Sequence, residues 1–130
     1  YALSAHDGVP KFARKTDAGI YTTPLIAGAT AYIASLDKCV YAINLDTGRD
    51  RWVFATAGRI FSSPILADDS LWIGSNDGIL YELAPATGAQ RHSFQMTERI
   101  VNKIAYSEHT KTFFVPTCAN EVYCLARKKE

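Results

Sequence analysis

The sequence predicts an all-β protein built from a repeated unit, and three observations lead to that prediction. Tyr1, Tyr41 and Tyr81 begin similar stretches at intervals of 40 residues. Short runs rich in isoleucine, valine, tyrosine, phenylalanine and tryptophan, the residues favoured in strands, recur along the chain. Turn sequences separate these runs at regular spacing, and no segment shows a sustained helical period. A fixed period of this size is typical of repeat architectures.

The unit spanning residues 60–99 shows the expected elements most clearly. Its four strands are predicted at Ile60–Ala67, Leu71–Ser75, Ile79–Ala84 and around Arg91–Gln95. The turns between them are Asp68-Asp69-Ser70, Asn76-Asp77-Gly78 and Thr87-Gly88. Asn-Asp-Gly is a strong hairpin signal, because these residues tolerate the backbone conformations of tight turns.

The neighbouring units repeat this pattern, with strands missing at both ends of the chain. In the unit spanning residues 20–59, strands are predicted at Ile20–Ala27, Thr30–Ser35, Cys39–Leu45 and Arg51–Ala55. Residues 1–19 contain only a third and a fourth strand, at Tyr1–Ser4 and Lys11–Arg14. Residues 100–130 contain three strands, and their first hairpin, Tyr106–Lys111, is longer by two residues than its counterparts.

Four-stranded units of about 40 residues are typical of the blades of a β-propeller. We therefore expect a partial propeller with two complete blades, 20–59 and 60–99, and two incomplete ones, 1–19 and 100–130. A propeller closes with about four to eight blades. The chain is thus expected to join the remaining blades of a longer protein or to complete a ring by self-association.

Charge and hydropathy exclude two classes of partner. Fourteen basic and thirteen acidic residues give a net charge of +1, which is too balanced for electrostatic binding of nucleic acid. Ala18–Leu36 carries no charge and approaches the length of a membrane span. Its repeat partner Gly58–Asn76, however, contains Arg59, Asp68 and Asp69. Two strands and a turn explain both copies, so no membrane span is expected.

The cysteines are interpreted as reduced thiols. Cys39, Cys118 and Cys124 are odd in number and include no Cys-x-x-Cys pair, which argues against a disulfide framework and against a metal site. Unpaired thiols favour a reducing compartment such as the cytoplasm, and a periplasmic location stays open.

A motif lies in the stretch Tyr41–Trp52. Its pattern, Ala42-x-Asn44-x-x-Thr47-Gly48-Arg49-x-x-Trp52, resembles the tryptophan-docking motif of pyrroloquinoline quinone (PQQ)-like propeller repeats, A-x-D-x-x-T-G-K-x-x-W. Phe12 and His92 stand at the tryptophan position in the flanking copies, where His92 is expected to replace a packing aromatic. The resemblance covers the whole chain. It implies a structural role, in which the tryptophan packs against a neighbouring blade.

The same resemblance implies what an enzyme of this class needs. Quinoprotein alcohol dehydrogenases hold PQQ beside a vicinal cysteine pair and a set of calcium-binding carboxylates, and neither pattern occurs in this sequence. The turns at Asp68-Asp69 and Asn76-Asp77-Gly78 are explained by turn chemistry rather than by calcium. We expect no catalytic residue, cofactor or metal site here. Under the alternative, in which the chain is part of a quinoprotein dehydrogenase, PQQ and calcium would bind.

The expected function is that of a non-catalytic scaffold module that binds a ligand or a protein, as the C-terminal part of a larger protein. In a propeller, the turns from second to third strands share a face with the segments that lead into each first strand. The candidate binding residues on that face are Arg59, Arg99, Asp37, Lys38, Asn76 and Asp77. Two arginines at equivalent positions suit an acidic partner, and ordinary solvated loop charges are the other interpretation.

Overall fold

The computed structural model describes residues 1–126, which form thirteen strands and no helix. The first sheet pairs β1 (Ala2–Leu3) with β2 (Pro10–Phe12). The second contains β3 (Leu25–Ala27), β4 (Thr30–Ala34), β5 (Cys39–Asn44) and β6 (Asp50–Ala55). The third contains β7 (Ile65–Ala67), β8 (Ser70–Gly74), β9 (Ile79–Leu83) and β10 (Gln90–Gln95). The fourth contains β11 (Ala105–Ser107), β12 (Thr112–Pro116) and β13 (Val122–Ala126).

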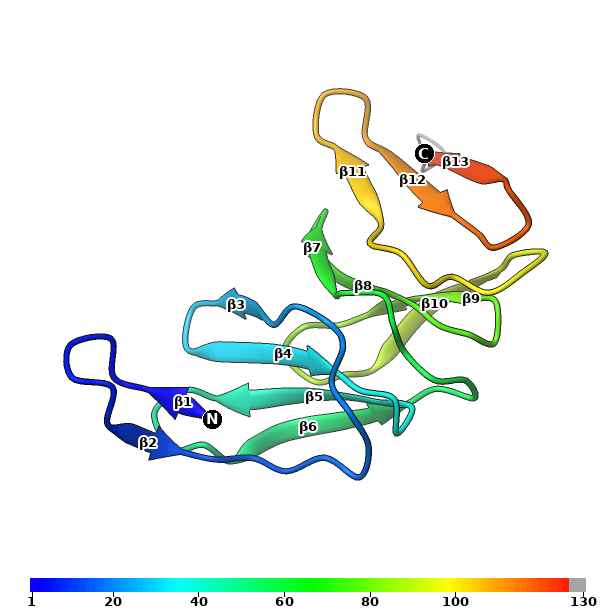
Figure 1. Cartoon of the computed structure of the whole chain (residues 1–130). Helices are drawn as coiled ribbons and strands as arrows, with labels where there is room; N and C mark the ends of the chain where they lie inside the picture. Colours follow the sequence, from blue (N-terminus) through cyan, green and yellow to red (C-terminus); the bar gives the residue numbers. More distant parts are fainter. Residues whose placement is uncertain (127–130) are drawn as a thin grey trace.

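All four sheets are antiparallel and follow one another in chain order, with β1 in the first sheet and β13 in the last (Figure 1). Sheets of two, four, four and three strands confirm the predicted fold class of two complete blades between two incomplete ones. Residues 127–130 of the last predicted unit lie outside the described residues.

The predicted first strands are too long. Strands were expected from Ile20 and Ile60, but pairing begins only at Leu25 in β3 and at Ile65 in β7. Proline, which has no N–H group, stands at positions 24 and 64 and cannot donate to a strand ladder. The residues before it bond across the joint between sheets instead, since the Ile60 amide donates to the Ser35 carbonyl at 3.4 Å.

The core lies between sheets, whose faces pack against one another. Tyr32, Val40 and Ala42 of the second sheet meet Leu71 and Ile73 of the third in one apolar cluster. A second cluster joins Trp72 and Leu80 of the third sheet to Phe113 and Val115 of the fourth. The third sheet therefore buries both faces, and β8 is buried throughout. Each sheet depends on its neighbours for its stability, as expected for stacked repeats.

Close packing at the joints also explains one strand glycine. A Cβ atom at Gly74 would lie 2.2 Å from Cγ2 of Ile100, a fully buried residue of the next unit. Such a distance is far below van der Waals contact. We call the stretch that precedes the first strand of a sheet its leading segment. Glycine at position 74 therefore lets the leading segment of the fourth sheet, which contains Ile100, pack directly against β8.

Candidate binding surface

The structure places the predicted binding residues along one series of loops. Asp37 and Lys38 lie between β4 and β5, and Asn76 and Asp77 lie between β8 and β9. Arg59 precedes β7, and its carbonyl oxygen accepts a hydrogen bond from the Asn76 amide at 3.0 Å. The equivalent bond in the next sheet joins the Cys118 amide to the Arg99 carbonyl at 3.1 Å. Each leading segment thus lies beside the turn that joins the second and third strands of its own sheet.

Two aspartates fasten these loops. The Oδ2 atom of Asp77 accepts hydrogen bonds from the amides of Ala57 and Gly58, at 3.1 and 3.2 Å, and from the Tyr81 hydroxyl at 2.7 Å. Its Oδ1 atom accepts from the Ile79 amide at 2.9 Å. Both carboxylate oxygens are therefore engaged by the protein. We assign this side chain to holding the leading segment against the turn rather than to contacting a ligand directly.

Asp37 repeats the arrangement one unit earlier. Its Oδ2 atom accepts from the Tyr41 hydroxyl at 2.7 Å and from the Asp17 amide at 3.0 Å. Burial raises the pKa of the Asp37 carboxyl, but hydrogen bonds from Tyr41 and from the amides of Cys39 and Asp17 outweigh it, so the net pKa is lowered. Burial, together with the bond to Asp37, raises the pKa of Tyr41. The pair is held as carboxylate and neutral phenol.

The fourth sheet uses different residues for the same purpose. Ala119 stands where the other units have aspartate. Here the Thr97 hydroxyl donates to Oε2 of Glu121 at 2.7 Å, and the Tyr123 hydroxyl donates to Oγ1 of Thr97 at 3.1 Å. The leading segment is again tied to the sheet by a carboxylate and a tyrosine. The substitution of aspartate by alanine is therefore compensated two residues further along.

The cationic side chains of the surface are directed to solvent. Lys38, Arg59 and Arg99 are all exposed. Arg99 has a long contact of 4.0 Å with the neighbouring Glu98 carboxylate, and its side chain is 58% exposed. Within residues 1–126, no ion pair involves Lys38 or Arg59. We call these loops and the leading segments beside them the loop surface. It presents exposed cations, whereas the carboxylates of Asp37 and Asp77 already accept hydrogen bonds from the protein.

A small polar cavity of about 140 Å³ lies at the third-to-fourth joint of this surface. The Oδ1 atom of Asn76 is buried there without a hydrogen-bond partner among the described residues. The residues that line the cavity include Asn76, Asp77, Gln95, Thr97, Glu98 and Arg99. The structure thus brings three of the predicted binding residues, Asn76, Asp77 and Arg99, to one hollow.

The motif residues lie at the joint between the second and third sheets. The Trp52 indole Nε1 donates to the Pro85 carbonyl at 2.9 Å, and its ring lies against Gly88, where a Cβ atom would approach within 2.6 Å. Ala42 is fully buried and pairs with Trp52 across β5 and β6. Phe12 lies against Gly48 in the same way, one unit earlier.

The other motif residues form the turn itself. The Asn44 side chain accepts hydrogen bonds from the amides of Asp46 and Thr47 at 2.9 and 3.0 Å. The Thr47 hydroxyl accepts from the Arg49 amide at 3.3 Å. Gly48 has a φ of 70°, in the left-handed region that glycine adopts at little cost. A β-carbon at this position would also strike the ring of Phe12.

Sequence reasoning missed a buried polar group at the next joint. Glu82 occupies the position of Ala42, and His92 that of Trp52. Glu82 is 1% exposed, and its carboxylate meets Nδ1 of His92 at 2.7 Å and the Ser70 hydroxyl at 2.6 Å. His92 is thus a polar partner of Glu82, and its ring also lies 6.4 Å from that of Phe94. The glutamate within the otherwise apolar run Ile79–Leu83 was the available signal.

Metal-binding clusters and membrane-spanning helices are both absent from the described residues. Among residues 1–126, no group of three or more histidine, cysteine, aspartate or glutamate side chains is placed to hold a metal ion. The thiols of Cys39, Cys118 and Cys124 are free. No helix in this part of the chain is long and apolar enough to cross a membrane.

Known structures share this fold. The crystal structure of BamB from Moraxella catarrhalis superposes with a TM-score of 0.82 at 17% identity, over 95% of this chain and 38% of that one. Quinohemoprotein alcohol dehydrogenase from Comamonas testosteroni gives 0.66 at 20% identity, over 75% of this chain and 17% of that one. The computationally designed Ika8 protein gives 0.68 at 10% identity, over 80% of this chain and 32% of that one. At these identities the likeness concerns the fold alone.

Sequence comparison identifies the family. No curated protein sequence matches the chain. A family model described as outer membrane protein assembly factor BamB matches residues 1–130, the whole chain. This chain spans 38% of the Moraxella BamB structure, so it corresponds to part of that propeller. The predicted PQQ-like repeats are confirmed, and the chain belongs to the BamB family of PQQ-like propeller proteins.

Proposed function

We propose that this chain is a non-catalytic scaffold module of a larger propeller and that it binds a protein through the loop surface. The matching family is described as an outer membrane protein assembly factor. A factor that assembles other proteins contacts them, which supports a protein partner. The proposed units are residues 1–19, 20–59, 60–99 and 100–130. We also propose that Trp52, which packs against the Thr87-Gly88 turn of the next unit, keeps these two units in register.

One observation carries the proposal: hydrogen bonds hold the loop surface in place while its cations stay exposed. Asp37 and Asp77 fasten the leading segments through backbone amides, so the loops need little ordering when a partner binds. Arg59 and Lys38 remain exposed. Arginine forms two parallel hydrogen bonds with a carboxylate, which suits an acidic protein surface.

Site-specific photocrosslinking tests this assignment. A photoreactive residue at position 38 should form adducts with one protein, and the double variant Arg59→Glu/Arg99→Glu should abolish them. The matched double variant Lys11→Glu/Arg49→Glu changes the charge equally at exposed positions outside these loops and should leave the adducts intact. Adducts that survive the arginine reversal, or that disappear equally in both variants, would refute the role of the loop surface.

A quinoprotein function is the second candidate, favoured by the structural likeness to the Comamonas dehydrogenase. Against it, the three cysteines of the chain are not adjacent, whereas such enzymes use a vicinal pair. The two candidates differ in a direct assay. Titration with PQQ and Ca²⁺ should leave the cofactor's absorbance unchanged for a scaffold, while a saturable spectral change would establish the quinoprotein alternative.

A further inference from the structure

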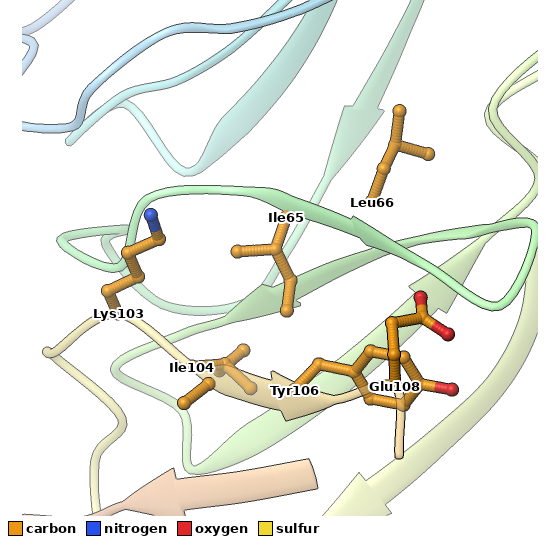
Figure 2. A pocket seen from close by; sticks show the side chains of 7 residues that line it. Ile65, Leu66, Lys103, Ile104, Tyr106 and Glu108 are labelled. Atoms are coloured by element: carbon orange, nitrogen blue, oxygen red, sulfur yellow. The ribbon is translucent and has the colours of Figure 1, made fainter. Parts of the chain in front are cut away.

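A second candidate site lies between the inner strands of the third and fourth sheets. A groove of about 520 Å³ separates β7 from β11 (Figure 2). Its lining includes Ile65, Leu66, Lys103, Ile104, Tyr106 and Glu108, none of which belongs to the loop surface. Pockets that hold ligands have volumes of about 300–1,000 Å³ and mostly apolar walls with a few polar groups. The groove is an open depression with apolar residues in its middle and charged residues at its ends.

The residues at this joint differ from those at the preceding one. At the preceding joint, the Thr23 amide donates to the Ser63 hydroxyl at 2.9 Å and ties the two inner segments together. Lys103 stands one period after Ser63 and has no hydroxyl to offer in the same position. Its side chain is exposed and makes no ion pair or hydrogen bond within residues 1–126. This joint therefore lacks the hydrogen bond found at the preceding joint and carries an unpaired lysine side chain instead.

Both walls of the groove are also sheet edges. β7 and β11 are the terminal strands of their sheets and pair on one side only, with β8 and β12. An edge strand presents unpaired N–H and C=O groups, which are a template for another extended segment. In addition, the Tyr106 hydroxyl is buried with no hydrogen-bond partner in the described part of the chain. The backbone groups of the two edge strands are therefore what the groove offers to an extended segment.

The charges have a direction along the groove. Lys103 lies at one end and Glu108 at the other, with Ile65 and Ile104 between them (Figure 2). Glu108 is already neutralised by Lys111, whose Nζ lies 2.6 Å from its carboxylate, so the free charge of the groove is the Lys103 ammonium. An occupant therefore needs an apolar middle and an anionic end, and backbone groups that pair with a strand.

We propose that the groove binds an extended peptide segment that adds to the edge of β11, with an aliphatic side chain against the partly exposed Ile65 and Leu66 and an acidic residue at Lys103. Main-chain hydrogen bonds give affinity in strand addition, and side-chain pockets give specificity. A free aliphatic carboxylate meets the apolar and anionic requirements but has no backbone for the strand edge. That difference separates the two occupants experimentally.

The test is an NMR titration of the ¹⁵N-labelled chain with the peptide acetyl-Glu-Val-Leu-Val-amide. Saturable shifts are expected for the amide signals of residues 65–67 and 105–107. Lys103→Glu should weaken binding about fivefold, the scale of one exposed ion pair, and a peptide with lysine in place of glutamate should recover it. Lys11→Glu, an equal charge change at an exposed position of β2, should have no effect.

Two further probes decide whether a strand is added. A peptide with N-methylated backbone amides keeps its side chains but cannot donate hydrogen bonds, and it should bind about tenfold more weakly. Decanoate should neither compete with the peptide nor shift the signals of residues 105–107. Equal binding of the methylated peptide, competition by decanoate, or no saturable shift would each overturn the proposal. The double reversal at Arg59 and Arg99 should leave this titration unchanged, so it is independent of the loop surface.

Discussion

The contact between Trp52 and Gly88 yields a sharp prediction for a double-mutant cycle. In the unmodified chain, Gly88→Ala places a methyl group 2.6 Å from the indole ring and forces alanine into a φ of +72°. Overpacking of this kind costs about 1–3 kcal/mol, and the left-handed backbone costs about 1–2 kcal/mol more. The expected loss in the free energy of unfolding is therefore about 2–5 kcal/mol.

Removing the ring should remove the first of these costs. Trp52→Ala alone is expected to cost about 3 kcal/mol, at the low end for tryptophan because the ring is only half-buried. In that background the ring no longer opposes the new methyl group. Gly88→Ala should then cost only the backbone contribution, about 1–2 kcal/mol. The coupling energy between the two changes is thus expected to be about 1–3 kcal/mol.

Urea denaturation followed by circular dichroism measures all four corners of the cycle. Gly8→Ala is the matched control, since Gly8 has a φ of +73° and a Cβ atom added there would meet nothing within 4 Å. It should cost about 1–2 kcal/mol in both backgrounds. If Gly88→Ala costs the same with and without the indole ring, the ring does not rest on the turn and the proposed joint is wrong.

Tyr81→Phe should reduce the alkaline loss of stability, and Tyr41, whose pKa is also raised, should cause the part that remains. Burial and the bond to Asp77 raise the pKa of Tyr81 from 10.0 to about 12. The stabilisation from Tyr81 is therefore complete below pH 10 and disappears between pH 10 and 12. Urea midpoints of the unmodified chain that stay constant across that range would contradict this. Cys118 and Cys124 should react readily with a thiol reagent in the native chain, whereas the partly buried Cys39, whose pKa burial raises, should react more slowly until the chain unfolds. Arg14→Gln should cost about 1 kcal/mol at low salt and less at high salt, since the guanidinium bonds both Asp50 oxygens at 2.9 and 2.7 Å.

The sequence predicted most strands because their signals are local. Alternation, β-branched residues and turn sequences placed β4, β5, β8 and β9 within about a residue of their bounds. The first strands failed because Ile60 is fixed by a neighbour rather than by its own sheet. Its amide bonds to Ser35, 25 residues earlier, and no local pattern reports such a partner.

The candidate sites were predicted less completely, for the same reason. Repeat position alone predicts that the loops carrying Arg59 and Asp77 share one face of the propeller. That the Asp77 carboxylate is occupied by the Ala57 and Gly58 amides depends on the three-dimensional path of the leading segment. Likewise, the groove at Lys103 requires knowing that Thr23 bonds to Ser63 at the preceding joint. Periodicity locates equivalent positions, but contacts between units decide what each position does.

The crossing bonds at Ile60 and Ile100 make the joints separately observable. Their amides donate to the Ser35 and Ser75 carbonyls of the preceding sheet, although neither residue lies in a strand. Hydrogen exchange at these two amides therefore reports separation of neighbouring units rather than fraying within one sheet. Protection factors at these amides would measure how often neighbouring blades separate. A partner that binds across adjacent blades would slow hydrogen exchange at these two amides before it affects amides within a sheet.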